Sequence, residues 1–185
     1  MIPTHFPDIQ GARLRLRPFR EADLPAFVAY RNNPDVARYQ SWHDYDMDRA
    51  RAFWEQQRDL QLGLPDSWYQ VAIADGEDRL VGDLALHFLE DGRQLELGFT
   101  LDPACQGRGY GQEAATLLLE LAFGDWQMHR VMAITDARNA PAAALLARLG
   151  FRREGHFIQN IWFKGAWGDE YLYAQLAGEW ASRTV

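Results

Sequence analysis

Three glycines stand close together just before a stretch that favours a helix. The segment reads CQGRGYGQEAA from Cys105 to Ala115, with glycines at positions 107, 109 and 111. Glycine costs conformational entropy, so a cluster of glycines needs a reason. A bare backbone lets N–H groups approach a phosphate, and the unpaired N–H groups that begin the following helix attract an anion. Arg108 adds a positive charge. The segment indicates an anion-binding loop, with a flexible turn before a helix as the competing interpretation.

The glycine spacing does not match two common nucleotide-binding motifs. A dinucleotide fold uses G-x-G-x-x-G after an early strand, and a P-loop uses G-x-x-x-x-G-K-[ST]. This chain has G-x-G-x-G past its midpoint and no P-loop string. The flanking sequence must therefore decide which phosphate-bearing ligand the loop would hold.

Composition and charge restrict the class of protein. The chain has 185 residues and a net charge of −7, which suits one domain spanning 1–185 and argues against a nucleic-acid partner. No apolar run reaches about 20 residues, and no signal peptide is visible, so neither a membrane nor secretion is expected. Cys105 is the only cysteine, which excludes an internal disulfide and fits the reducing cytoplasm. No histidines share a metal-ligand spacing, so no metal site is expected.

Apolar periodicity and turn residues predict the elements that must position this loop. Alternating or apolar runs predict strands at 12–19, 68–74, 79–89, 92–101, 129–135, 155–163 and 169–176. Helical spacing predicts helices at 20–32, within 45–63, at 110–123 and at 139–149. Asp46 and Asn139 are candidate N-caps, and Gly150 ends the last helix. The order predicts an α/β (α+β) fold, with a mixed sheet of about seven strands flanked by helices.

The glycine segment and its surroundings together resemble a known family. QGRGYG resembles the Q/R-x-x-G-x-G/A signature of the GNAT acyltransferases, which bind acetyl-CoA, with Gln106, Gly109 and Gly111 at the matching positions. Four longer segments resemble the RimJ/RimL-type branch: RLRLRPFREADLPAF, ELGFTLDPACQGRGYGQEAA, NAPAAALLARLGFRREG and FKGAWGDEYLYA. The likeness covers nearly the whole chain.

The resemblance implies how acetyl-CoA would bind. The amides of residues 106–112 would hold the pyrophosphate, and the fourth and fifth strands would splay apart to admit the pantetheine arm. Asn139 would contact that arm, and its role as an N-cap is an equal alternative. The cofactor-binding residues predicted in this way are Phe99, Thr100, Leu101, Gln106, Gly107, Arg108, Gly109, Tyr110, Gly111, Gln112 and Asn139.

The catalytic groups match the family only in part. Many GNAT enzymes place a tyrosine four residues before the Gly-Phe pair, and RimJ/RimL-type chains often place a serine three residues after the asparagine. These positions hold Leu146 and Ala142, so the usual general acids are missing. Glu96 matches a glutamate that many members use as general base, with a solvated surface glutamate as the alternative. Cys105 is disfavoured as a nucleophile because no histidine lies nearby in sequence.

The acceptor side is predicted from two segments, the N-terminal helices and the last hairpin, both of which wall the acceptor site in this family. Aromatic and acidic side chains there suit a cationic amine, although Asp46 and Asp48 also suit the first turn of a helix. The acceptor-binding residues predicted first are Trp42, Asp44, Asp46, Trp162 and Asp169. Further candidates are His43, Tyr45, Asp48, Trp167 and Glu170.

Three functions are consistent with these observations. The acidic balance favours acetyl transfer from acetyl-CoA to a small polycationic amine, such as an aminoglycoside-type antibiotic. The RimJ/RimL resemblance gives the α-amine of a protein N-terminus as an alternative. The third is a non-catalytic domain that only binds acetyl-CoA. A homodimer is left open.

Overall fold

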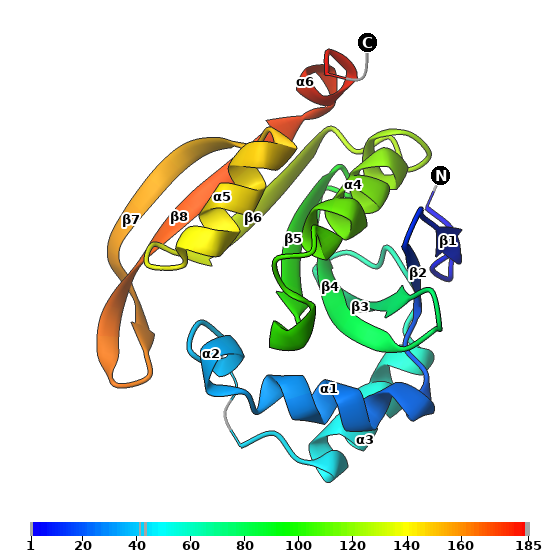
Figure 1. Cartoon of the computed structure of the whole chain (residues 1–185). Coiled ribbons are helices and arrows are strands. Elements are labelled where there is room, and N and C mark those ends of the chain that lie inside the picture. The colour runs from blue at the N-terminus through cyan, green and yellow to red at the C-terminus, as the bar shows by residue number, and fades with distance from the viewer. Residues whose placement is uncertain (1, 41, 43, 184–185) are drawn as a thin grey trace.

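The computed structural model describes residues 2–40, 42 and 44–183. Within these residues, eight strands form one mixed sheet in the order β1-β2-β3-β4-β5-β6-β8-β7 (Figure 1). The strands are β1 (Ile9–Gln10), β2 (Leu14–Pro18), β3 (Ser67–Asp75), β4 (Leu80–Phe88), β5 (Gln94–Leu101), β6 (Arg130–Asp136), β7 (Arg152–Phe163) and β8 (Ala166–Leu176). The α-helices are α1 (Leu24–Arg31), α2 (Pro34–Ala37), α3 (Met47–Arg58), α4 (Tyr110–Phe123), α5 (Ala140–Leu149) and α6 (Ala177–Ala181).

The two faces of the central strands differ in polarity. Apolar side chains such as Val71, Leu84 and Leu97 are buried in the main core together with Leu118 of α4. The alternate side chains point to the other face, because successive residues of a strand alternate. That face holds Gln70, Asp83 and most of the polar residues of β3, β4 and β5, and the aromatic side chains of α1 and α3 cover part of it. One face of the sheet is therefore core, and the other has a polar strip.

The predicted helix caps are confirmed. The Asp46 side chain accepts a hydrogen bond from the Arg49 N–H at 2.8 Å at the start of α3. The Asn139 side chain accepts one from the Ala142 N–H at 3.2 Å at the start of α5. Gly150 ends α5 with a φ of 88°, which a side chain would disfavour.

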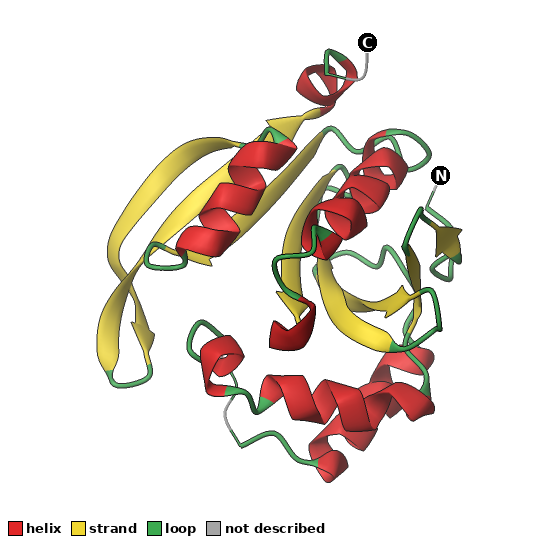
Figure 2. Ribbon diagram, viewed as in Figure 1, coloured by secondary structure: helices red, strands yellow, loops and turns green. Residues whose placement is uncertain are grey.

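The fold class is confirmed, with local differences (Figure 2). The additional strand is β1, whose two residues pair with β2 and are too few to show periodicity. The helix predicted over 20–32 begins as a 3-10 turn at Glu21–Asp23, and the chain then forms the short α2 after Asn33. The last hairpin is longer than predicted and turns at Lys164-Gly165, where both residues have positive φ.

The predicted fourth and fifth strands, now β5 and β6, diverge as expected. They pair in parallel only at Gln94, Leu95 and Glu96. β5 continues to Leu101 and β6 to Asp136 without further pairing between them, and Figure 1 shows α1 and α2 near the open ends. Backbone groups on the facing edges are thus free to bind an extended ligand. No helix in the described part of the chain is long and apolar enough to cross a membrane.

Candidate active site

A cleft of about 810 Å³ lies beside the open edge of β5. Ten of the eleven residues predicted to bind the cofactor line it. They are Phe99, Thr100, Leu101, Gln106, Gly107, Gly109, Tyr110, Gly111, Gln112 and Asn139. Arg108 is the exception, and it lines a neighbouring cleft together with Arg17, Arg20 and Arg79. We call the first of these two clefts the cofactor cleft.

The three glycines of the loop differ in what surrounds them. Gly107 and Gly109 have φ values of 72° and 80°, the left-handed region that disfavours side chains. A Cβ on Gly107 would meet no protein atom within 4 Å, whereas one on Gly109 would lie 3.2 Å from the Arg13 guanidinium. Gly111 lies within α4, where a Cβ would crowd Leu101 and Leu145 at 3.2 Å. Gly107 therefore faces open space, and Gly111 allows close packing.

Arg13 holds the glycine loop in place. Its Nη1 donates to the Arg108 carbonyl at 2.7 Å, and its Nε donates to Glu113 at 2.8 Å. Burial alone would raise the pKa of Glu113, but the N–H donors and charge of Arg13 outweigh it and lower that pKa. The loop is thus tied to β2 through an ionised carboxylate in the first turn of α4.

Loss of this tie is expected to weaken cofactor binding. Arg13→Ala removes the bond to the loop carbonyl, so the loop must be ordered when the cofactor binds. We expect the KM for acetyl-CoA to rise about three- to tenfold, the worth of one typical intramolecular hydrogen bond. Steady-state kinetics at saturating acceptor measures this. Arg15→Ala, which removes a surface ion pair to Asp8, is the control and should leave this KM unchanged.

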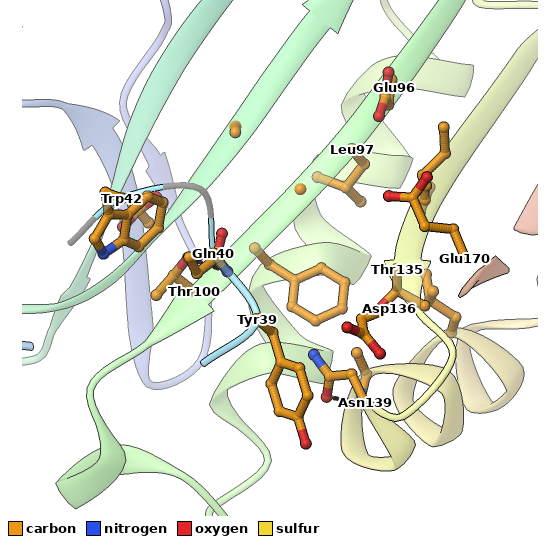
Figure 3. Close-up of a pocket in the computed structure, with 18 of the residues that line it drawn as sticks. Tyr39, Gln40, Trp42, Glu96, Leu97, Thr100, Thr135, Asp136, Asn139 and Glu170 are labelled. Carbon is orange, nitrogen blue, oxygen red and sulfur yellow. Dashed lines mark hydrogen bonds between the residues drawn. The ribbon is translucent and has the colours of Figure 1, made fainter. Parts of the chain in front are cut away.

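A second cavity of about 410 Å³ opens on the polar face of the sheet, and we call it the acceptor cavity. Its lining joins β3, β4, β5, β6, α5, the β7–β8 hairpin and the segment after α1. The two cavities meet where β5 and β6 diverge, and they share Tyr39, Gln40, Phe99, Thr100, Asn139 and Ala142. Figure 3 shows Tyr39 and Asn139 at one end of this cavity and Glu96 at the other.

Glu96 lines this cavity and is not simply a solvated surface residue. Its side chain is only 20% exposed, and its Oε2 lies 3.4 Å from His87 Nδ1 on the neighbouring strand. The other ring nitrogen of His87 lies 3.0 Å from Asp66, and Trp68 stacks on the ring. A chain of titratable groups therefore runs from the cavity through His87 to the exposed Asp66.

A buried carboxylate lies four residues before His87 on the same strand. Asp83 accepts hydrogen bonds from the Tyr30 hydroxyl and the Gln70 amide. Burial raises the pKa of Asp83, more strongly than the charge of Arg31 and these two donors lower it. Asp83 opposes Thr100 of β5, so this end of the cavity carries a second carboxyl group.

Of the acceptor residues predicted first, only Trp42 lines this cavity. Asp44 and Asp46 lie outside its lining, where Asp46 caps α3, and His43 falls outside the described residues. Trp162 and Asp169 also lie outside the lining. Asp169 instead accepts from the Gln159 N–H and faces His156 at 3.1 Å. Its neighbour Glu170, on the opposite side of β8, does line the cavity.

Seven polar side chains of the lining carry no role predicted from the sequence: Arg31, Tyr39, Gln40, Gln70, Asp83, Thr135 and Asp136. Gln70 and Asp83 had a signal in the sequence, because each is a polar residue within an otherwise apolar strand pattern, WYQVAIA and RLVGDLALHFL. Such a residue needs partners when buried, which marks it for structural or functional use. Arg31 had no comparable signal, since an arginine in the last turn of a helix is ordinary.

Comparison with known proteins shows the family to which this chain belongs. The family model described as "Acetyltransferase (GNAT) domain" matches residues 13–152. The chain belongs to the GNAT acetyltransferases. It is 31% identical to an uncharacterized N-acetyltransferase, YnaD, of Bacillus subtilis (strain 168), over 93% of this chain and 98% of the relative. The spermidine N(1)-acetyltransferase of Escherichia coli (strain K12) is 26% identical over 82% and 80% of the two chains.

A solved structure confirms the GNAT fold. The GNAT-family acetyltransferase from Bacillus anthracis superposes with a TM-score of 0.83 at 28% identity, over 93% of this chain and 99% of that one. GNAT enzymes use acetyl-CoA, and the residues present fit that cofactor. The cofactor cleft has an open strand edge for the pantetheine arm and an unobstructed glycine backbone beside the first turn of α4.

The positions that hold general acids in many GNAT enzymes carry side chains here that cannot donate a proton. Leu146 and Ala142 both line the acceptor cavity, and both are buried and apolar. The only tyrosine of the cavity lining within the described residues is Tyr39, whose hydroxyl donates to the Arg138 carbonyl at 3.4 Å.

Proposed function

We propose that this GNAT enzyme transfers the acetyl group of acetyl-CoA to a primary amine on a small acceptor molecule bound in the acceptor cavity. The observation that carries this proposal is the junction of the two cavities at the divergence of β5 and β6. A thioester bound along β5 would present its carbonyl carbon at that junction. An amine entering from the polar face would meet it there.

Glu96 is the proposed general base. A lysine-like amine has a pKa of about 10.4, so freeing its lone pair costs roughly 4 to 5 kcal/mol at pH 7. Glu96 is the last residue of β5 that pairs with β6, and it lines the acceptor cavity. Removal of the amine proton by Glu96, directly or through a water, would lower this cost. Backbone N–H groups of β5 beyond Glu96 would stabilise charge on the carbonyl oxygen.

The chemistry of the lining bears on the acceptor class. Glu96 and Glu170 suit a cationic amine at one end of the cavity. A polycation, such as the aminoglycoside type or the spermidine used by the Escherichia coli relative, would gain from more carboxylates. Two more carboxyl groups line the cavity, but Asp136 is paired with Arg138 and Asp83 already accepts from Tyr30 and Gln70. The aspartates expected to supply free carboxylates, Asp44 and Asp46, lie outside the lining. We therefore favour an acceptor with one amine, and an N-terminal α-amine of a protein is the second candidate.

Release of CoA from acetyl-CoA in the presence of an amine panel tests the proposal. The panel should contain simple monoamines, ω-amino acids, polyamines, an aminoglycoside and short peptides with a free N-terminus. Turnover of small monoamines or amino acids above the hydrolysis background supports the proposal. Turnover of peptides alone would shift it to the protein N-terminus. A rise in melting temperature with acetyl-CoA but no turnover of any amine would favour a non-catalytic domain.

The acidic residues at the start of α3, Asp44, Asp46 and Asp48, are proposed as a long-range attraction for multiply charged amines. Asn caps a helix as well as Asp does, so Asp44, Asp46 and Asp48 can be changed together to Asn with the cap retained. For spermidine at low salt, we expect KM to rise about two- to fivefold, and this difference should vanish at about 0.5 M salt. For a monoamine KM should hardly change. An unchanged spermidine KM would limit these residues to capping.

A further inference from the structure

Arg31 is a buried cation in the lining of the acceptor cavity. The residue is 8% exposed, at the end of α1, and its guanidinium lies 3.8 Å from the ring centre of Trp42 and 4.1 Å from that of Phe27. Tyr45 and Phe53 complete the aromatic surround. The rings contact the faces of the guanidinium and cannot accept its in-plane N–H groups as a carboxylate would.

The Nε–H of Arg31 has no partner among the described residues. It is buried without a hydrogen bond, and Arg31 interacts with Asp83 through charge alone. The nearby carboxyl group of Asp83 already accepts from Tyr30 and Gln70. Glu96 and Glu170 do not pair with Arg31 either. Glu96 faces His87, and Glu170 accepts from Asn160 at 2.6 Å. A buried guanidinium with unused donors is costly unless a ligand supplies the acceptor.

We propose that Arg31 binds a carboxylate of the acceptor molecule, so that the enzyme acetylates amines that also carry a carboxylate. The inference rests on the proposed function and names its substrate class. A guanidinium fork matches the two oxygens of a carboxylate. A singly charged group suits this single cation, since a phosphate dianion would leave excess negative charge in a cavity that Asp83, Glu96, Asp136 and Glu170 already line.

The sheet register sets the distance between the Glu96 end and the Arg31 end of the acceptor cavity. Glu96 opposes His87 on β4, and Thr100 opposes Asp83. Asp83 marks the Arg31 end, because it accepts a hydrogen bond from Tyr30, the neighbour of Arg31 in the chain. His87 and Asp83 are four residues apart on β4, which is about 13 Å at about 3.3 Å per residue. The amine that gives its proton to Glu96, directly or through a water, lies toward the opposite end of the acceptor cavity from Arg31. The carboxylate should therefore stand several bonds from the amine, which favours ω-amino acids over α-amino acids.

The test compares matched acids and amides of increasing length. Glycine, β-alanine, γ-aminobutyrate and ε-aminohexanoate, each beside its carboxamide, are supplied with acetyl-CoA, and kcat/KM is measured from CoA release. We expect the longer acids to exceed their amides about 10- to 100-fold, the worth of a hydrogen-bonded charge pair. Arg31→Met should reduce this ratio to about one, and Arg31→Lys should retain part of it. The KM for acetyl-CoA should be unchanged in both variants.

Arg58→Met is the matched control. Its guanidinium also lies over a tryptophan, Trp54, at 5.1 Å, but outside the lining of the acceptor cavity. The acid-to-amide ratio of this variant should equal that of the wild type. Phosphoethanolamine distinguishes the two anion types, and a preference for it over β-alanine would overturn the carboxylate assignment. Wild-type ratios near one, or an unchanged ratio in Arg31→Met, would overturn the proposal as a whole.

A binding measurement separates this inference from the proposed function. The acetylated product ε-acetamidohexanoate should raise the melting temperature of the wild type more than its amide does, and Arg31→Met should lose this difference. This readout needs no turnover. An acid-specific shift without acetylation of any amine would refute the proposed function and leave the carboxylate site standing. Acetylation of amines without an acid-specific shift would refute the carboxylate site alone.

Discussion

Replacing Gly107 with valine is expected to abolish the rise in melting temperature that acetyl-CoA gives the wild-type protein. Gly107 lines the cofactor cleft, and an added Cβ meets only open space on the protein side. The new side chain would therefore stand where a phosphate must approach the loop amides. Loss of two hydrogen bonds to a charged phosphate should raise the Kd for acetyl-CoA at least about 100-fold. Calorimetric titration measures it directly.

Gly92→Val provides the control for backbone strain. Gly92 has a φ of 63° and open space around its Cβ position, but lies in the turn between β4 and β5, outside the cofactor cleft. Both valines force a side chain into the left-handed region, at about 1–2 kcal/mol each. Both variants should lose similar stability, and only Gly107→Val should lose acetyl-CoA binding. Normal binding by Gly107→Val would mean that the loop does not hold the cofactor.

The same substitution at the other two glycines would be harder to interpret. A valine at Gly109 would press on Arg13, and one at Gly111 would press α4 away from Leu101 and Leu145. Each would disturb the protein before any ligand arrives. The sequence indicates that the three glycines belong together, but their separate roles depend on neighbours about 100 residues earlier in the chain or 34 residues later.

Local signals account for the parts of the fold that the sequence predicts well. The caps at Asp46 and Asn139, the αL glycine at 150 and the turn at Lys164-Gly165 each depend on residues within a few positions. Most of the residues predicted to bind the cofactor lie within the short segment from Phe99 to Gln112, and ten of the eleven line one cleft. These caps and turns depend on residues that are close in sequence, so residue type and spacing are enough to predict them.

The acceptor side depends on register, which short-range patterns do not give. Asp169 and Glu170 are adjacent and equally acidic, yet only Glu170 lines the cavity, because neighbouring residues of a strand point to opposite faces. Likewise, Asp83 meets Tyr30 of α1 across 53 residues. Asp44 and Asp46 looked suited to an amine by type, but the start of α3 lies outside the cavity lining. Residue type alone could not separate these cases.

Glu96→Gln is expected to lower kcat/KM at pH 7 by roughly 10²- to 10⁴-fold, the usual worth of a positioned acid–base group. Glutamine keeps the shape of the side chain and its contact with His87 Nδ1, but cannot take a proton from the amine. The affinity for acetyl-CoA should not change, because Glu96 lies outside the cofactor cleft. Initial rates of CoA release at saturating acetyl-CoA, together with a binding titration, separate the two quantities.

The pH dependence distinguishes a lost base from a disturbed cavity. The free-amine fraction of an acceptor with a pKa of about 10.4 rises nearly tenfold for each unit between pH 7 and 9. The variant no longer has a group to remove the proton, so its rate should rise with that fraction and approach the wild-type rate at high pH. A variant with a distorted cavity would stay slow at every pH.

Glu170→Gln is the comparison that assigns the base. Glu170 lines the same cavity, and its Oε2 is held by the Asn160 amide. If Glu96 takes the proton, the Glu170 variant should raise the acceptor KM a few-fold through lost attraction and keep a wild-type pH profile. Nearly full activity of Glu96→Gln at pH 7 would remove Glu96 from the role. The steep pH rescue would then be expected in Glu170→Gln, because Glu170 is the other glutamate of the cavity lining among the described residues.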